Sequence, residues 1–155
     1  MTNEPASKVR KSAEKSFASG LFCAESVLLA LAQGQGIQSE LLPKMASGFC
    51  SGMARTCGTC GAVTGAIMGL GMILGRSQAG ESVEPVYAAT QRFMGEFERE
   101  FGSRDCHVLL GCDLGTPEGQ ATFREKKLGE RCAHYTGRAA EIAANILAEA
   151  HSGQS

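Results

Sequence analysis

The segment best suited to chemistry is Cys57-Gly58-Thr59-Cys60-Gly61, where two cysteines stand just before an apolar, glycine-rich stretch. This stretch predicts a helix, and the exposed N–H groups and dipole at a helix N-terminus stabilise a thiolate. We therefore expect Cys60 to be the most acidic thiol and an attacking nucleophile. Cys57 is then either a resolving thiol or an extra ligand, and the alternative is an incidental loop residue.

The chain has seven cysteines, and its charged N-terminus is not followed by the apolar run of an export signal. Such usage points to metal binding or redox chemistry rather than to structural disulfides. A zinc ribbon needs two C-x2-C pairs, and this sequence has one. Cys106, Cys112 and Cys132 match neither common ferredoxin spacing, so an iron–sulfur site has to be assembled from separate segments. His107 and His134 are expected to be exposed residues rather than ligands.

Apolar residues recur at helical spacing along most of the chain, and no alternating strand pattern is present. Helices are predicted over about 9–18, 22–34, 39–46, 60–74, 85–101, 106–110 and 116–126, and from 132 onward. Residues 48–58 have too much glycine and too little periodicity, and they predict a loop. We expect one all-α domain over residues 1–155, a compact bundle of about five to seven helices with a Gly/Cys-rich loop and a frayed tail at 151–155.

The helical positions of two cysteines and three glycines indicate which side chains face the core and where helices pack closely. Cys23 and Cys132 lie on apolar faces and so point toward the core, where a free cysteine is often only a small apolar residue. Gly61, Gly65 and Gly69 lie four residues apart along one side of the helix over 60–74. Because glycine destabilises a helix, this stripe predicts close approach of another backbone or room for a bulky group.

Composition and charge exclude several classes of partner. The 15 Lys and Arg residues balance 16 Asp and Glu residues, so no strong field attracts nucleic acid or an anionic membrane. The longest apolar stretch, Gly61–Leu74, is shorter than the roughly 18 residues that indicate a membrane span. We expect a cytoplasmic protein without nucleic-acid or membrane partners, which acts with a redox partner protein or a small thiol and can form a homo-oligomer.

Several short stretches carry a recognisable pattern together with Cys132: Phe22-Cys23-Ala24-Glu25-Ser26-Val27, Gly48-Phe49, Cys60-Gly61-Ala62-Val63-Thr64-Gly65, Cys106-His107-Val108-Leu109-Leu110-Gly111 and Thr116-Pro117-Glu118-Gly119. In these stretches the chain resembles the redox-active proteins named C_GCAxxG_C_C after their cysteine pattern. The resemblance covers nearly the whole chain. It implies that the four cysteines of the family are Cys23, Cys60, Cys106 and Cys132.

The same resemblance implies kinship with split-Soret cytochromes, which join a similar cysteine-bearing domain to haem sites and a proposed iron–sulfur site. No C-x-x-C-H segment is present, so covalently attached haem is not expected here. Cys50, Cys57 and Cys112 lie outside the family pattern. They make this chain richer in thiols than the pattern requires.

Three functional hypotheses remain open. In the first, the four family cysteines bind an iron–sulfur cluster that transfers electrons, and backbone N–H groups around Gly58 and Gly61 bond to its sulfurs. In the second, Cys60 acts in a dithiol–disulfide oxidoreductase with Cys57 or another cysteine as its partner. In the third, the chain is a non-catalytic helical or zinc-stabilised interaction domain.

Overall fold

The computed structural model describes residues 3–153, and its regular structure is entirely helical. The elements are α1 (Glu4–Ala18), α2 (Cys23–Gly34), the 3-10 helix η1 (Lys44–Phe49), α3 (Cys50–Arg55), α4 (Gly61–Leu74), α5 (Glu84–Phe101), α6 (Cys106–Leu110), α7 (Pro117–Glu125) and α8 (Gly129–Ser152). No strand forms within residues 3–153. The predicted all-α class is confirmed, with eight α-helices in this range.

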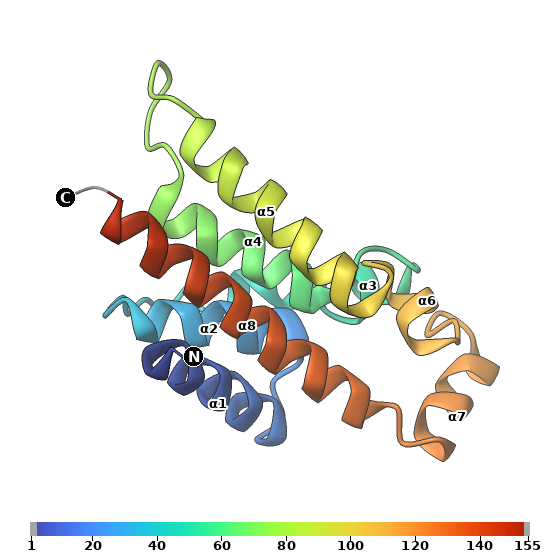
Figure 1. The fold of residues 1–155 in the computed structure, drawn as a ribbon. Helices are drawn as coiled ribbons and strands as arrows, with labels where there is room; N and C mark the ends of the chain where they lie inside the picture. The colour runs from blue at the N-terminus through green and yellow to red at the C-terminus, as the bar shows by residue number, and fades with distance from the viewer. Residues whose placement is uncertain (1–2, 154–155) are drawn as a thin grey trace.

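The five longer helices form the body of the molecule, and the short ones gather at one end of it. α8 has 24 residues and packs against α1, α2, α4 and α5. In Figure 1, α4 and α5 lie on one side of α8, and α1 and α2 lie on the other. α6 and α7 stand beyond the end of α5, beside the start of α8. We call the body of α1, α2, α4, α5 and α8 the packed half.

Aromatic rings of α5 fill the centre of the packed half. Phe93 and Phe97 are fully buried, with ring centroids 5.9 Å apart, and Phe101 lies 4.8 Å from Phe97. Tyr135 of α8 meets Phe101 edge-on at 4.9 Å, an arrangement that aromatic pairs favour. Gly102 ends α5 in the left-handed region with a φ of 83°, which glycine adopts without strain. Phe93, Phe97 and Phe101, spaced four residues apart along α5, therefore face the core.

The glycine stripe of α4 is where α2 and α4 come closest. A Cβ added at Gly65 would lie 2.6 Å from the carbonyl oxygen of Ala24, and one at Gly69 would overlap the side chain of Leu31. The predicted close approach of another backbone is therefore present. α4 has 14 residues, and none of the helices in residues 3–153 is both long and apolar enough to cross a membrane.

The sequence predicts residues 48–58 as a loop. Residues 48–55 instead fold into the end of η1 and the six-residue α3, and residues 56–58 lie outside any helix. The backbone of α3 is left-handed, because residues 51–55 have φ values between 56° and 68°. A left-handed helical residue other than glycine costs roughly 1–2 kcal/mol. The loop prediction is wrong for residues 48–55 because periodicity detects only right-handed helices that bury one face. Local hydrogen bonds and contact with Cys106, which is distant in sequence, hold this turn.

The C-terminal tail is more ordered than the sequence predicts. His151 and Ser152 continue α8 rather than fraying, and the Nε2 atom of His151 lies 3.3 Å from the Oε1 atom of Gln35. Residues 154–155 of the predicted tail lie outside the described residues. The long apolar face of α8 explains why the helix persists to its last turn.

Candidate redox site

Four cysteines from four different helices line one cavity of about 360 Å³. Cys23 begins α2, Cys60 directly precedes α4, Cys106 begins α6, and Cys132 lies in the first turn of α8. Most of the remaining wall consists of aromatic rings and leucine side chains. The structure thus brings together the four positions that the family pattern marks. The ligand and catalytic roles predicted for them stay predictions.

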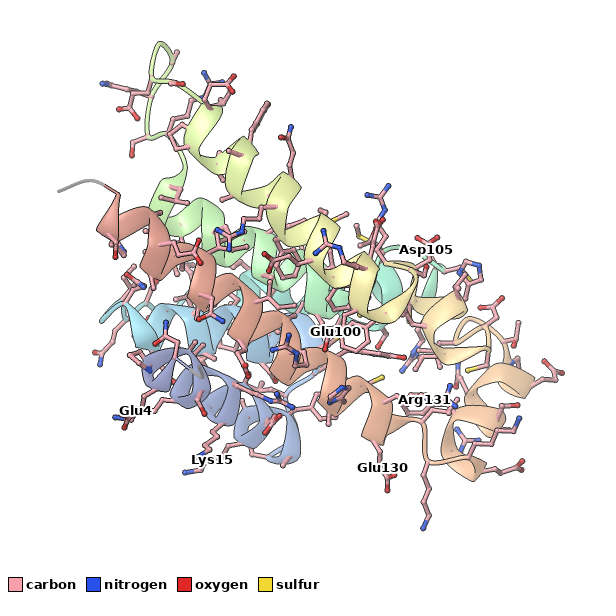
Figure 2. All side chains as sticks on the ribbon, in the orientation of Figure 1. Glu4, Lys15, Glu100, Asp105, Glu130 and Arg131 are labelled. Atoms are coloured by element: carbon pink, nitrogen blue, oxygen red, sulfur yellow. The ribbon has the colours of Figure 1, made fainter. Side chains whose placement is uncertain are left out.

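A short backbone bridge brings Cys60 to Cys106. Thr59 and Asp105 form an isolated antiparallel β-bridge. In it, the N–H of Cys60 donates to the carbonyl of Arg104 at 2.7 Å, and the N–H of Cys106 donates to the carbonyl of Gly58 at 3.0 Å. Figure 2 shows Asp105 at the junction of α5 and α6, at the end of the molecule where α8 begins. Two cysteines separated by 45 residues are therefore held by paired backbone hydrogen bonds rather than by side-chain packing alone.

The missing side chain of Gly61 makes room for Cys23. An added Cβ at Gly61 would overlap the sulfur of Cys23 and would lie 3.0 Å from the carbonyl oxygen of Phe49. The first turn of α2 is fixed by Glu25, whose carboxylate accepts the N–H of Phe22 at 3.0 Å. Gly61 also lines the cavity, and its N–H has no partner within α4 because it belongs to the first turn. The predicted cofactor-facing position of Gly61 is compatible with this geometry.

The left-handed α3 presses its backbone against Cys106. A Cβ added at Gly52 would lie 2.6 Å from the Cβ of Cys106, so only glycine fits there. The carbonyl of Gly52 accepts the N–H groups of Thr56 at 3.2 Å and Gly58 at 2.9 Å, which stabilises the turn. Strained backbone of this kind is concentrated at functional sites in proteins. We define the cysteine end as residues 50–61 and 103–132 together with the first turn of α2.

Burial raises the pKa values of three of the four thiols. Desolvation raises the pKa of Cys60 and of Cys132 to about 12 each, and that of Cys106 to about 11. The N–H groups of Ala62 and Val63 at the start of α4 act in the opposite direction on Cys60 and are outweighed. The prediction that Cys60 is the most acidic thiol is therefore wrong. The N-terminal helix effect is present, but Cys60 is only 7% exposed, and its thiolate loses more in hydration than it gains from the helix.

Cys57 interacts with Asp113, a residue that its spacing to Cys60 does not predict. It is half-buried, has a left-handed φ of 58°, and its thiol is hydrogen-bonded to Asp113, which raises the pKa of Cys57. The N–H of neighbouring Gly58 is already donated to the carbonyl of Gly52. The N–H of Gly58 is therefore engaged within the turn in this conformation. The cofactor-binding role of Gly58 and the catalytic role of Cys57 stay predictions.

The two remaining cysteines lie beside the site. Cys112 is half-buried and packs in the small cluster formed by Cys106, Leu110 and Leu128. Cys50 is only 4% exposed and lies behind Cys23, and its hydrogen bond with Cys23 raises the pKa of Cys50. All seven cysteines are free thiols.

Polar residues of the cavity wall were missed by sequence reasoning. Arg55 of α3 and Arg124 of α7 both line the cavity, where a positive charge favours bound negative charge. Tyr135 also lines it and donates its hydroxyl to the carbonyl of Leu109 at 3.1 Å. Its position three residues after Cys132 on α8 is the one signal that could have revealed it. Nothing in the local sequence of Arg55 or Arg124 indicates their role.

The histidines do not join the four cysteines around the cavity. His107 is exposed, and exposed His134 packs edge-on against Phe101 with ring centroids 5.6 Å apart. Among residues 3–153, no three His, Cys, Asp or Glu side chains are close enough together to hold one metal ion. The four cysteines of the site therefore line a cavity without converging on a position for a single metal ion.

An all-α protein with four cysteines around one apolar cavity has the architecture of a thiol-based redox or cofactor-binding protein. A family model described as "Putative redox-active protein (C_GCAxxG_C_C)" matches residues 21–146, which include all seven cysteines. The chain belongs to this family. Neither the curated proteins nor the solved structures contain a match to the chain.

Proposed function

We propose that this chain is an electron-transfer protein in which Cys23, Cys60, Cys106 and Cys132 hold an iron–sulfur cluster. The observation that carries the proposal is that these four cysteines, from four separate helices, line a single cavity. Such a cluster supplies one-electron transfer at a potential that its protein surroundings tune. A cluster is larger than a single ion, so its four thiolate ligands lie farther apart than the ligands of one metal ion. This spacing suits cysteines that line a cavity.

The surroundings of the cavity suit a negatively charged, four-thiolate group. Arg55 and Arg124 supply positive charge at the wall, and the apolar rings of Phe22 and Phe123 limit contact with water. The N–H groups of Ala62 and Val63 point toward the sulfur of Cys60. In the metal-free protein these two N–H groups do not offset the desolvation that raises the pKa of Cys60. They would stabilise the Cys60 thiolate once it is bound to a metal cation.

Anaerobic purification, or reconstitution with iron and sulfide, tests the proposal directly. We expect visible charge-transfer absorbance, with iron and sulfide in equivalent amounts, and loss of both in Cys60→Ser and Cys106→Ser. Cys57→Ser is the matched control, because its sulfur faces Asp113 and its removal takes no ligand away. A colourless wild-type protein without iron, or equal loss of the chromophore in Cys57→Ser, contradicts the cluster.

A dithiol–disulfide oxidoreductase is the second candidate. It is supported by the shared cavity of Cys60, Cys106 and Cys132 and by the electrostatic effect of the other two thiols, which raises the pKa of Cys60. In this alternative the partner of Cys60 is one of these two cysteines rather than Cys57. Trapping of a stable Cys60 adduct in a Cys106→Ser or Cys132→Ser variant of a colourless protein would favour it over the cluster. A zinc-stabilised interaction domain has no supporting ligand group among residues 3–153.

The location and partners follow from the proposed chemistry. Electrons have to be exchanged with a redox partner protein or a small thiol, and we propose that this takes place in the cytoplasm. The nearly equal numbers of acidic and basic residues favour a partner bound through a local surface rather than through overall charge.

A further inference from the structure

Cys50 and Cys23 form a buried thiol pair. Cys23 belongs to the family pattern and lines the cavity, whereas Cys50 does neither. Cys50 is 4% exposed and Cys23 is 8% exposed, and the neighbouring thiol of Cys23 raises the pKa of Cys50. The sulfur of Cys23 and the carbonyl of Phe49 both lie against Gly61, which places the residue before Cys50 beside Cys23. The chain at Cys50 therefore lies close to the sulfur of Cys23.

The side chain of Cys50 is held in this position by the first turn of α2 and by η1. Its sulfur lies 3.6 Å from the Oε1 atom of Glu25 and 3.7 Å from the carbonyl oxygen of Ala46. The same carboxylate of Glu25 also accepts the hydroxyl of Ser47 at 2.8 Å. Cys50 therefore has little freedom to turn away from Cys23.

The two thiols differ in their access to small molecules. Cys23 lines the cavity, whereas Cys50 lies outside its wall. A reagent in the cavity meets the sulfur of Cys23 first, and Cys50 approaches that sulfur from the protein side. This is the arrangement of an accessible thiol with a resolving thiol behind it.

We propose that Cys23 and Cys50 are a disulfide-forming pair that is oxidised by small organic disulfides through the cavity. The sulfur of Cys23 attacks one sulfur of the small disulfide, forming a mixed disulfide and releasing the first small thiolate. The sulfur of Cys50 then attacks Cys23, which forms the Cys23–Cys50 bond, breaks the mixed disulfide and releases the second small thiolate. The two protein thiol protons end on the two released thiols, and two electrons pass from the pair to the small disulfide.

The consequence for the four-cysteine site rests on the proposed function. Cys23 in a disulfide with Cys50 has no thiolate to offer a cluster, so oxidation of the pair would prevent cluster assembly. Reduction by a small thiol would restore the ligand. Cys50 would then make the site sensitive to the thiol–disulfide state of its surroundings, a role that the four family cysteines alone do not supply.

Peptide mapping of the reduced, metal-free chain after treatment with 2-hydroxyethyl disulfide tests the pair. Trypsin places Cys23 in the peptide 16–44 and Cys50 in the peptide 45–55, so a bond between them joins two separable peptides. We expect this linked product and the loss of both free thiols of this pair. In Cys50→Ser we expect loss of one thiol at this pair and a persistent 2-mercaptoethanol adduct on Cys23.

Cys112→Ser is the control, because it removes another cysteine outside the family pattern and should leave the linked product unchanged. A stable adduct on Cys23 in the wild-type chain, or linkage of Cys23 to another cysteine, overturns the proposal. So does absence of reaction at Cys23. Cys50→Ala provides a second variant if the serine variant loses its helical circular dichroism, and the wild-type map decides if both unfold.

The same samples separate this proposal from the proposed function. Reduced wild-type protein is offered iron and sulfide, and oxidised wild-type protein is offered them in parallel. Failure of the reduced protein to gain visible absorbance counts against the cluster, while the peptide map still decides the disulfide. Equal absorbance in both samples, with the Cys23–Cys50 bond intact, overturns the proposed consequence for the site.

Discussion

The packed half and the cysteine end of this molecule use small residues for opposite purposes. In the packed half, Gly65 and Gly69 of α4 let α2 approach until the two helices are in direct backbone contact. At the cysteine end, Gly52 and Gly61 let the backbone approach Cys106 and Cys23 beside a cavity of about 360 Å³. In the packed half, close approach at glycine packs two helices tightly together. At the cysteine end, it brings the backbone against cysteines that line a cavity.

This difference indicates that the packed half stabilises the fold, whereas the cysteine end contains features that destabilise it. Close packing of apolar side chains stabilises the regular helices, and the fully buried Phe93 and Phe97 are the largest contributors of this kind. The cysteine end contains a left-handed turn and an apolar cavity, each of which costs free energy in the ligand-free chain. A bound group that fills the cavity would offset part of this cost.

The largest expected effect comes from truncating matched aromatic residues in the two regions. Phe97→Ala should lower the free energy of unfolding by about 3–5 kcal/mol, because its fully buried ring contacts neighbours on all sides. Phe123→Ala should cost less than half as much, because its half-buried ring already faces the cavity. Urea unfolding of the metal-free proteins measures both. Equal losses would show that the cavity is not open in solution.

A smaller effect is expected from the buried thiol of Cys60 at alkaline pH. Its pKa is raised from an ordinary 9.0 to about 12, so the neutral form stabilises the fold fully below pH 9, and this contribution is lost as the pH rises toward 12. Between pH 8 and pH 10.5, the reduced wild-type chain should lose roughly 2 kcal/mol more stability than Cys60→Ser, which has no ionisable thiol. Urea unfolding at both pH values measures the difference. Parallel pH profiles would mean that Cys60 ionises freely and is not desolvated.

The packed half could be predicted from the sequence because its information is local. The helical spacing of Phe93, Phe97 and Phe101 and the glycine stripe of α4 each predict a buried face, and both faces are buried. The ends of α5 were equally readable, since Pro85 and Gly102 have strong preferences at helix termini. Periodicity and turn chemistry were sufficient there.

The cysteine end could be predicted only in part, because its geometry depends on residues far apart in sequence. The family pattern selected the four cysteines of the cavity, but the bridge between Thr59 and Asp105 has no local signal. The acidity expected for Cys60 was wrong because its sequence position shows the helix N-terminus but not the burial. The handedness of α3 depends on Gly52 packing against a residue of another helix. Long-range contacts therefore decided each feature that sequence reasoning missed.

The smallest expected effect uses one substitution with opposite signs in the two regions. Ala54 is exposed in the left-handed α3 with φ 56° and ψ 44°, a conformation that glycine adopts without the Cβ penalty. Ala54→Gly should therefore raise the free energy of unfolding by about 0.5–1 kcal/mol, after the greater flexibility of glycine in the unfolded chain is counted. Ala88 is exposed in the right-handed α5, where Ala88→Gly should lower it by up to about 1 kcal/mol. Neither substitution removes buried contacts, so urea unfolding of the two variants compares backbone conformation alone. Destabilisation of both variants by the same amount would show that residue 54 is not left-handed in solution.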